Sequence, residues 1–179
     1  DMPSSLMHIY LIEAGPRLLA GMSEESSAHA EQFLREMGVN ILLNKRVVDY
    51  RDHKVVLEDG TEIATRTFIW VSGVTGVTIG NLDASLIGRG GRIKVDSFNR
   101  VEGMNNVFAI GDQCIQLADE NYPNGHPQLA QVAIQQGELL AKNLVRMEKG
   151  REMKPFHYRN LGSMATVGRN RAVAEFSKV

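Results

Sequence analysis

The chain has 179 residues, 43% hydrophobic and 23% charged, which is typical of a soluble globular protein with one ample domain or two small ones. Its formal net charge of −1 argues against a general nucleic-acid binder, because no basic excess is available to neutralise phosphates. No apolar run approaches the about 18 residues of a membrane span, DMPSSLMHIY is not a signal peptide, and a single cysteine excludes an internal disulfide and fits a reducing cytoplasm.

The first third of the chain predicts a strand, a helix and a second strand. HIYLIE (8–13) is a short, largely apolar run followed by the turn-prone AGPR. Ser23 is a suitable N-cap for the next helix and Gly38 a suitable residue for its C-terminal cap. VNILLN (39–44) is the second strand, so the order indicates a βαβ unit and a parallel sheet. The helix has one apolar face, formed by Ala30, Phe33, Leu34 and Met37.

A hairpin and a buried strand are expected next. Two strand-like stretches within residues 54–63 flank Asp59-Gly60, a strong signal for a tight turn. TFIWVSGV (67–74) is then a buried strand, with Trp70 in the core. The glycine-rich link GVTGVTIGN (73–81) that follows is the best candidate for a boundary between two structural units.

The second half predicts two strands, a long helix and a tail of short strands. RIKVDSFNRV (92–101) and NNVFAIGD (105–112) are expected as strands joined by a turn. Pro127 suits the first position of a helix that runs to Gly150. Its apolar side would consist of Leu129, Val132, Ala133, Leu140 and Leu144. The tail alternates three strand-like pieces, FHYRN, SMATVG and AVAEF.

The chain has no phosphate loop of its own. No segment matches G-x-G-x-x-G, in which glycines let the backbone approach a pyrophosphate at a helix N-terminus. The first strand nevertheless ends in Glu13, as a second Rossmann strand ends in an acid that binds an adenosine ribose. Alone, Glu13 is weak evidence, because a glutamate at a strand end more often simply faces solvent. The combination suggests that the sequence starts inside a nucleotide-binding fold.

The order of motifs resembles two-dinucleotide-domain flavoprotein reductases, and above all type II NADH dehydrogenase, a single-subunit NADH:quinone oxidoreductase that carries FAD. The resemblance covers about residues 8–176, and its most specific motifs are NNVFAIGD and AQVAIQQG. It implies an α/β fold in two parts with small β-hairpin elements. Residues 1–75 would be a partial NAD(H)-binding Rossmann-like unit, and residues 76–179 the C-terminal part of an FAD-binding one.

The resemblance also implies FAD contacts. Asp112 would bind the ribityl chain, and Gly111 would let the ligand approach the backbone. The helix after Pro127 would point its N-terminus at the flavin ring, where its N–H groups stabilise the reduced form. The matching residues of its first turns are Leu129, Ala130, Gln131 and Val132.

Further roles follow for the quinone and for NAD(H). Gln131 and Gln135 are four residues apart and share a helical face, which would line the quinone pocket; Gln136 is expected to face elsewhere. Glu13 would bind the NADH ribose, and Ser72 and Gly73 would lie near the nicotinamide. The pattern departs from the family at Leu161, where many members have a lysine.

No catalytic side chain or metal ligand is expected. Cys114 has no redox partner and is expected to be a small packed residue. His126 is expected to be a solvated loop histidine. The remaining histidines show no metal-ligand spacing: His8, His29, His53 and His157.

The implied activity passes electrons from NADH through FAD to a quinone, with the chain itself inactive. Two alternatives stay open: another FAD/NAD-dependent reductase of the ferredoxin or peroxide type, and a non-catalytic nucleotide-fold interaction module. The parent protein would sit on the cytoplasmic face of the inner membrane through segments outside this sequence. Exchange of elements in a homodimer is a hypothesis for covering exposed sheet edges.

Overall fold

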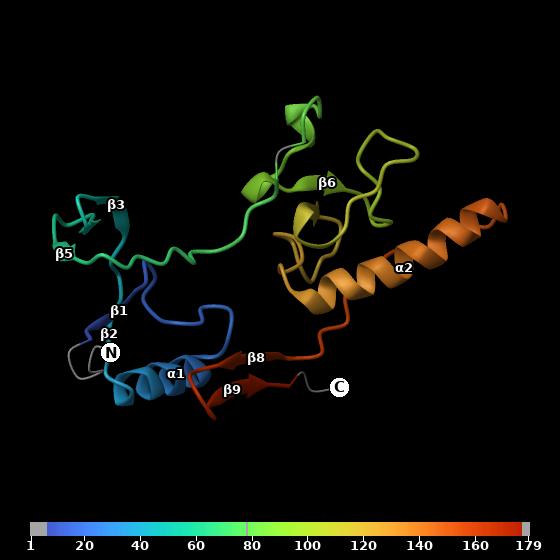
Figure 1. The fold of residues 1–179 in the computed structure, drawn as a ribbon. Coiled ribbons are helices and arrows are strands. Elements are labelled where there is room, and N and C mark those ends of the chain that lie inside the picture. The colour runs from blue at the N-terminus through green and yellow to red at the C-terminus, as the bar shows by residue number, and fades with distance from the viewer. Residues whose placement is uncertain (1–6, 78, 177–179) are drawn as a thin grey trace. The chain divides into compact units, whose positions relative to one another are not determined.

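The computed structural model describes residues 7–77 and 79–176 (Figure 1). Most of the opening segment, residues 1–6, and Thr78 of the glycine-rich link lie outside the described residues. Contacts divide the chain into unit 1, residues 1–70 and 161–179, and unit 2, residues 71–160. The expected NAD and FAD domains were 1–75 and 76–179. The main difference is that residues 161–179, expected in the second domain, belong to unit 1. The division by cofactor stays a prediction.

Unit 1 begins with the expected βαβ unit. Strand β1 (Ile9–Ile12) is followed by helix α1 (Glu24–Glu36) and strand β2 (Val39–Leu42). The two strands pair in parallel from Ile9 opposite Val39 to Ile12 opposite Leu42. Because parallel strands need a crossover connection, the helix between them determines this arrangement.

Helix α1 has the predicted ends. The Ser23 side chain accepts a hydrogen bond from the Ser26 N–H at 3.1 Å, and Gly38 follows the helix with φ +82°. Ala30 is buried against Val167 and Val173. These two valines come from the last part of the chain, which explains why residues 161–176 belong to unit 1.

Two antiparallel elements complete unit 1. Strands β3 (Val47–Arg51), β4 (Lys54–Leu57) and β5 (Glu62–Ala64) form one sheet. The predicted turn at Asp59-Gly60 joins β4 to β5, with Gly60 at φ +83° and its N–H donating to the Leu57 carbonyl at 2.9 Å. Strands β8 (Ser163–Thr166) and β9 (Ala172–Glu175) form a hairpin, so two of the three predicted tail strands are confirmed.

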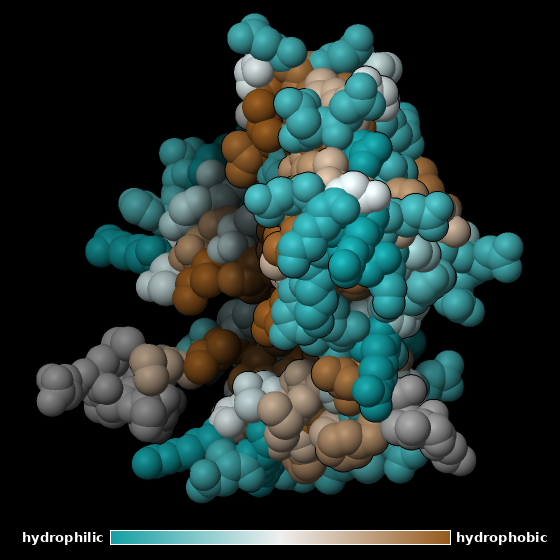
Figure 2. Space-filling view, turned by 90° about the vertical axis from the view of Figure 1, so that its right-hand side faces the viewer, coloured by the Kyte–Doolittle hydropathy of each residue, from teal (hydrophilic) through white to brown (hydrophobic). Residues whose placement is uncertain are grey.

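The strand predicted at 67–74 is wrong. This segment has no strand structure, and its apolar side chains are largely exposed: Trp70 to 61% and Val71 to 83%. The expected core position of Trp70 is wrong for the same reason. A strand needs a neighbouring strand to receive its backbone hydrogen bonds, and no described residue pairs with this segment. Hydrophobic residues, brown in Figure 2, are visible at the surface of the molecule.

Unit 2 contains a short parallel sheet and one long helix. Strands β6 (Ile93–Val95) and β7 (Cys114–Gln116) pair in parallel, and helix α2 covers Ala130–Glu148. The described residues of this unit include the 3₁₀ turns η2 (Ala84–Leu86), η3 (Arg89–Gly91) and η4 (Gly111–Gln113). The core packs side chains from β6, β7 and the segments between them: Ile93, Val95, Val101, Ala109 and Cys114.

The predicted strand at 105–112 is also wrong as a regular element. Only an isolated antiparallel bridge, Arg100 to Phe108, forms there, and the strand of this region is β7, which begins after Asp112. The backbone is used in irregular hydrogen bonds instead, such as Ala109 N–H to the Asn99 carbonyl at 3.0 Å. The glycine and the acid therefore stand in η4, before a strand rather than after one.

Helix α2 begins three residues later than predicted. Pro127 lies before the helix, and Leu129 is its N-cap. The buried face consists of Val132, Gln136 and Asn143, while Leu129 and Leu144 are exposed. The buried Asn143 amide is satisfied by two hydrogen bonds to the backbone of Lys154, of 2.8 and 2.9 Å. FHYRN (156–160) is not a strand; it is a loop segment beside the helix.

Candidate functional site

The turn η4 packs against the beginning of α2. The Gly111 N–H donates to Gln136 Oε1 at 2.7 Å. Gly111 has φ +63°, and a Cβ placed on it would lie 3.2 Å from the Cβ of Ala133. Only glycine meets both conditions without strain. The structure thus brings the predicted Gly111–Asp112 segment next to the first turns of α2.

Asp112 is held by its backbone and exposes its side chain. Its carbonyl accepts a hydrogen bond of 3.2 Å from Gln128 Nε2, which comes from the segment before α2. The next residue, Gln113, binds both backbone groups of Val77, at 2.7 and 2.9 Å. The position of the Asp112 backbone is therefore determined on both sides, and its exposed carboxylate is a suitable acceptor for ligand hydroxyls.

The start of α2 has no side-chain cap. Leu129 is the N-cap residue, and its side chain cannot accept a hydrogen bond from the first turn. The Val132 and Ala133 N–H groups donate to the Leu129 carbonyl at 3.0 and 3.2 Å. Ala130 is exposed, Gln131 half-buried and Val132 buried. Of the four predicted flavin contacts, Val132 serves the packing of the helix.

The side chain of Gln135 is hydrogen-bonded to a neighbouring segment and does not face an open tunnel. Its Nε2 donates to the Arg159 carbonyl at 2.9 Å, and its Oε1 accepts from the Arg159 N–H at 3.0 Å. One amide hydrogen and one lone pair remain for another partner. Gln135 also lines a surface groove of about 270 Å³ between α2 and the segment 155–157, together with Glu138, Leu139, Lys142, Pro155, Phe156 and His157.

The residues predicted for NAD(H) lie in both units. Glu13, in unit 1, follows β1, and its Oε1 accepts a hydrogen bond of 2.6 Å from the Gly15 N–H. It is half-buried at the carboxyl end of the parallel pair, the edge where such sheets bind ligands. Ser72 and Gly73, in unit 2, are exposed, and Gly73 has φ +121°.

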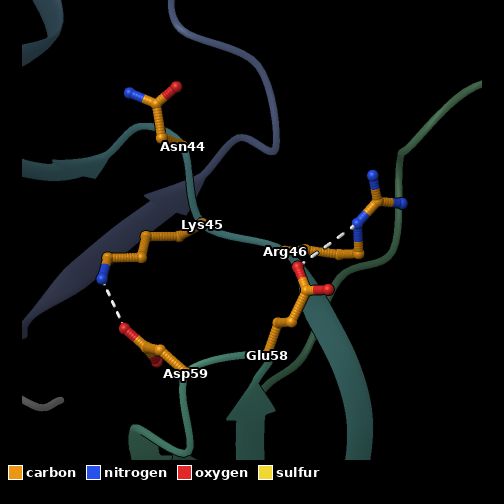
Figure 3. Close-up of a pocket in the computed structure, with 5 residues that line it drawn as sticks. All are labelled: Asn44, Lys45, Arg46, Glu58 and Asp59. Carbon is orange, nitrogen blue, oxygen red and sulfur yellow. Dashed lines mark hydrogen bonds and ion pairs between the residues drawn. The ribbon is translucent and has the colours of Figure 1, made fainter.

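A small charged pocket lies beside the end of β2 in unit 1. It has a volume of about 170 Å³ and is lined by Asn44, Lys45, Arg46, Glu58 and Asp59. Lys45 pairs with Asp59, and Arg46 Nε lies 3.7 Å from Glu58 Oε2 (Figure 3). Its cations are thus already paired with carboxylates, and such exposed pairs contribute little to stability. The Lys45 N–H donates to the Glu13 carbonyl at 3.1 Å, so this pocket adjoins the Glu13 backbone.

Cys114 is a packed residue, as predicted. It is buried between Gln136, Asn99 and the Gly111 carbonyl, and burial raises the pKa of its thiol. A raised pKa keeps the thiol protonated and unreactive at neutral pH. The described residues include no group of three or more His, Cys, Asp or Glu that could hold a metal ion.

The prediction of a solvated His126 is wrong. The residue is 1% exposed and packs against the rings of Tyr122, Phe156 and Tyr158. Its Nε2 lies 2.9 Å from Asp119 Oδ2. A single loop histidine carries no sequence signal of burial, because Phe156 and Tyr158, two of its three aromatic neighbours, come from a distant part of the chain.

Sequence reasoning also missed the residues that hold the site together. Gln136 was expected only to face away from Gln135; it does, and it binds Gly111. Arg92 is buried and donates to the Cys114 carbonyl at 2.6 Å and to the His126 carbonyl at 3.1 Å. Gln135 and Gln136 are adjacent in the sequence, but the backbone groups that they bind, at Arg159 and Gly111, lie about 25 residues away.

Comparison with known proteins identifies the family. The family model described as pyridine nucleotide-disulphide oxidoreductase matches residues 4–137, well over half of the chain. The chain belongs to this family.

The similar curated proteins are longer than this family member. It is 34% identical to the type II NADH:quinone oxidoreductase NdhA of Mycobacterium tuberculosis over 96% of this chain and 38% of that protein. It is 32% identical to a type II NADH:quinone oxidoreductase of Staphylococcus aureus over 89% of this chain and 40% of that protein. The chain thus spans about two fifths of the length of these relatives.

Solved structures show the same fold. NDH2 from Plasmodium falciparum, in complex with NADH, superposes with a TM-score of 0.82 at 18% identity, over 96% of this chain and 50% of that one. A ferredoxin reductase from Rhodopseudomonas palustris superposes with a TM-score of 0.66 at 20% identity, over 84% of this chain and 37% of that one. The predicted α/β, Rossmann-type fold is confirmed. Among the described residues, no helix is long and apolar enough to cross a membrane.

Proposed function

We propose that the chain is part of a flavoprotein oxidoreductase that passes electrons from NADH through FAD to a quinone. One observation carries the proposal: the Gly111–Asp112 turn is held against the first turns of α2 by the Gly111–Gln136 hydrogen bond. Two segments that resemble FAD-binding motifs of type II NADH dehydrogenase are therefore neighbours. The family membership and the relatives named as NADH:quinone oxidoreductases support the same activity.

The residues present fit the flavin part of this proposal. The exposed Asp112 carboxylate would accept hydrogen bonds from ribityl hydroxyls, and Gly111 keeps the turn free of a side chain. The start of α2, Leu129 to Val132, has an N-cap residue without a capping side chain and would direct its positive dipole end at the ring. When bound, the flavin supplies the hydride and electron chemistry, and the protein supplies orientation and electrostatics.

The nicotinamide and quinone parts rest on fewer contacts. Glu13 would accept hydrogen bonds from the NADH ribose and repel a 2′-phosphate, and the backbone at Ser72 and Gly73 would approach the nicotinamide. Gln131 and Gln135 would donate to a quinone carbonyl without adding charge. Gln135 lines the groove of about 270 Å³ and retains one amide hydrogen beyond its bonds to Arg159, which supports this role.

We propose a cytoplasmic, membrane-surface location for the whole protein and no activity for this chain alone. The reason for inactivity is chemical. Without a G-x-G-x-x-G loop, the chain has no matching backbone site for the pyrophosphate of either dinucleotide. The likeness to a ferredoxin reductase concerns the fold alone and gives that alternative no separate support.

A flavin titration tests the proposal. The purified chain is mixed with FAD, separated from free flavin, and its absorbance spectrum recorded before and after NADH is added. We expect weak FAD binding that falls in Asp112→Ala and persists in Glu120→Ala, an exposed acid of the same unit. Equal binding by both variants would remove Asp112 from the site. A stoichiometric yellow complex that oxidises NADH would refute the inactivity of the chain.

A further inference from the structure

His126 is the most buried histidine of unit 2 and stands three residues before the N-cap of α2. Its side chain is 1% exposed, and that of Asp119 is 9% exposed. The hydrogen bond to His126 lowers the pKa of Asp119, which is therefore ionised at neutral pH. Nε2 must then carry the hydrogen and donate to the carboxylate. Nδ1 has no hydrogen-bond partner among the described residues, so Nε2 is the polar anchor of the ring.

The loop between Asp119 and His126 is closed by its own hydrogen bonds. Asn121 N–H donates to Asp119 Oδ1 at 3.0 Å, and Gly125 N–H donates to the Tyr122 carbonyl at 2.8 Å. The loop also crosses β7 closely, since a Cβ on Gly125 would lie 2.6 Å from a side-chain carbon of Ile115. The Asp119–His126 hydrogen bond joins the two ends of this loop.

A second set of contacts joins His126 to the strand that follows the Gly111–Asp112 turn. The buried Arg92 side chain donates to the carbonyl of Cys114 and to the carbonyl of His126. One guanidinium thus links the start of β7 to the approach to α2. The side chain of His126 binds Asp119 and its backbone binds Arg92, so the residue is held at both points.

The start of α2 depends on these contacts because no capping side chain fixes it. A Ser, Thr, Asp or Asn at the N-cap would define the first turn locally. Leu129 makes no such bond. The segment that leads into the first turn is then important for its position. In that segment His126 is held at two points, by Asp119 and Arg92, and Gln128 makes a single hydrogen bond to the Asp112 carbonyl.

We infer that His126 is a positioning residue for the first turn of α2, acting through its Nε2 hydrogen bond to Asp119 and its backbone contact with Arg92. The inference rests on the proposed function in one respect: that turn is where the flavin contacts Leu129 to Val132 are placed. His126 itself need not touch the ligand.

Three substitutions and one control test this role in the full chain. His126→Phe keeps an aromatic ring in the cage and removes the donor, and Asp119→Asn removes the charged acceptor. His126→Gln restores an amide N–H near the Nε2 position. Glu120→Gln is the matched control, because Glu120 is an exposed acid next to Asp119 in the same loop.

Amide hydrogen exchange of Val132 and Ala133, whose N–H groups donate to the Leu129 carbonyl, is the first measurement. We expect exchange about tenfold faster or more in His126→Phe and Asp119→Asn, the usual effect of losing a charge-assisted hydrogen bond. We expect near wild-type rates in His126→Gln and Glu120→Gln. Exchange in α1 should not change. Unchanged rates in His126→Phe, no rescue by His126→Gln, or an effect of Glu120→Gln equal to that of Asp119→Asn would overturn the inference.

FAD titration of the same variants separates this inference from the proposed function. Weaker binding in His126→Phe with recovery in His126→Gln supports both. If the wild-type chain takes up no FAD, the flavin site fails for this chain, while the exchange rates still decide the role of His126.

Discussion

Replacing Gly111 by alanine should destabilise unit 2 through two separable effects. The first is conformational, because φ +63° costs an L-residue about 1–2 kcal/mol. The second is steric, because the new methyl group would lie 3.2 Å from the Cβ of Ala133. Overpacking of a well-packed contact typically costs about 1–3 kcal/mol.

Gly150 provides a matched control for the conformational effect. It has the same φ of +63°, lies just after α2, and a Cβ on it would meet nothing within 4 Å. Both substitutions also reduce the entropy of the unfolded chain by the same amount, about 0.4–1 kcal/mol. The difference between the two variants therefore isolates the contact with Ala133.

Urea unfolding followed by far-ultraviolet circular dichroism measures that difference. We expect Gly111→Ala to lose about 1–3 kcal/mol more unfolding free energy than Gly150→Ala. Ala133→Gly in the Gly111→Ala background should recover part of it, after allowing about 1 kcal/mol for glycine in a helix. Equal losses in Gly111→Ala and Gly150→Ala would refute the packing of η4 against α2.

Two further predictions concern buried hydrogen bonds. Gln136→Leu should lower the unfolding free energy by about 1–3 kcal/mol, because the Gly111 N–H loses its acceptor. Gln135→Leu should lower it less in the same urea assay, because the hydrogen bonds of Gln135 are exposed. A larger loss in Gln135→Leu than in Gln136→Leu would contradict the role given to the Gly111–Gln136 hydrogen bond. The hydrogen bond from His126 is the main cause that lowers the pKa of the Asp119 carboxyl in the folded state. The ionised carboxylate therefore stabilises the fold at pH values above its unfolded pKa of about 3.9, and this stability is lost as the pH falls through the lower folded pKa. Thermal unfolding of wild type and Asp119→Asn between pH 7 and pH 2 should therefore show a gap that narrows in acid, whereas a constant gap would exclude the linkage.

Elements defined by nearby residues were predictable from the sequence. Ser23 and Gly38 delimit α1 because a cap bonds to backbone groups within three or four residues. Asp59-Gly60 makes its turn for the same reason. Cys114 was expected to be a packed residue because the sequence offers it no redox partner, and it is buried.

Elements that need distant partners were predicted less well. The apolar run 67–74 has the composition of a buried strand but pairs with no described residue, so Trp70 is exposed. At Pro127 the local preference for a first helical position was overridden by the anchored loop before it, and α2 starts at Ala130. His126 was misjudged because Tyr122, Phe156, Tyr158 and Asp119 surround it only in the folded chain.

The sequence by itself determined the βαβ unit, the hairpin turn and the resemblance of NNVFAIGD and AQVAIQQG to flavin-binding motifs, since each depends on composition and short-range spacing. Only the tertiary structure decided that Gly111 binds Gln136, that Gln135 binds Arg159 and that Arg92 links Cys114 to His126. The physical reason is that a buried polar group must find a partner wherever the fold provides one. Those partners lie more than 20 residues apart in the chain, beyond the reach of any local pattern.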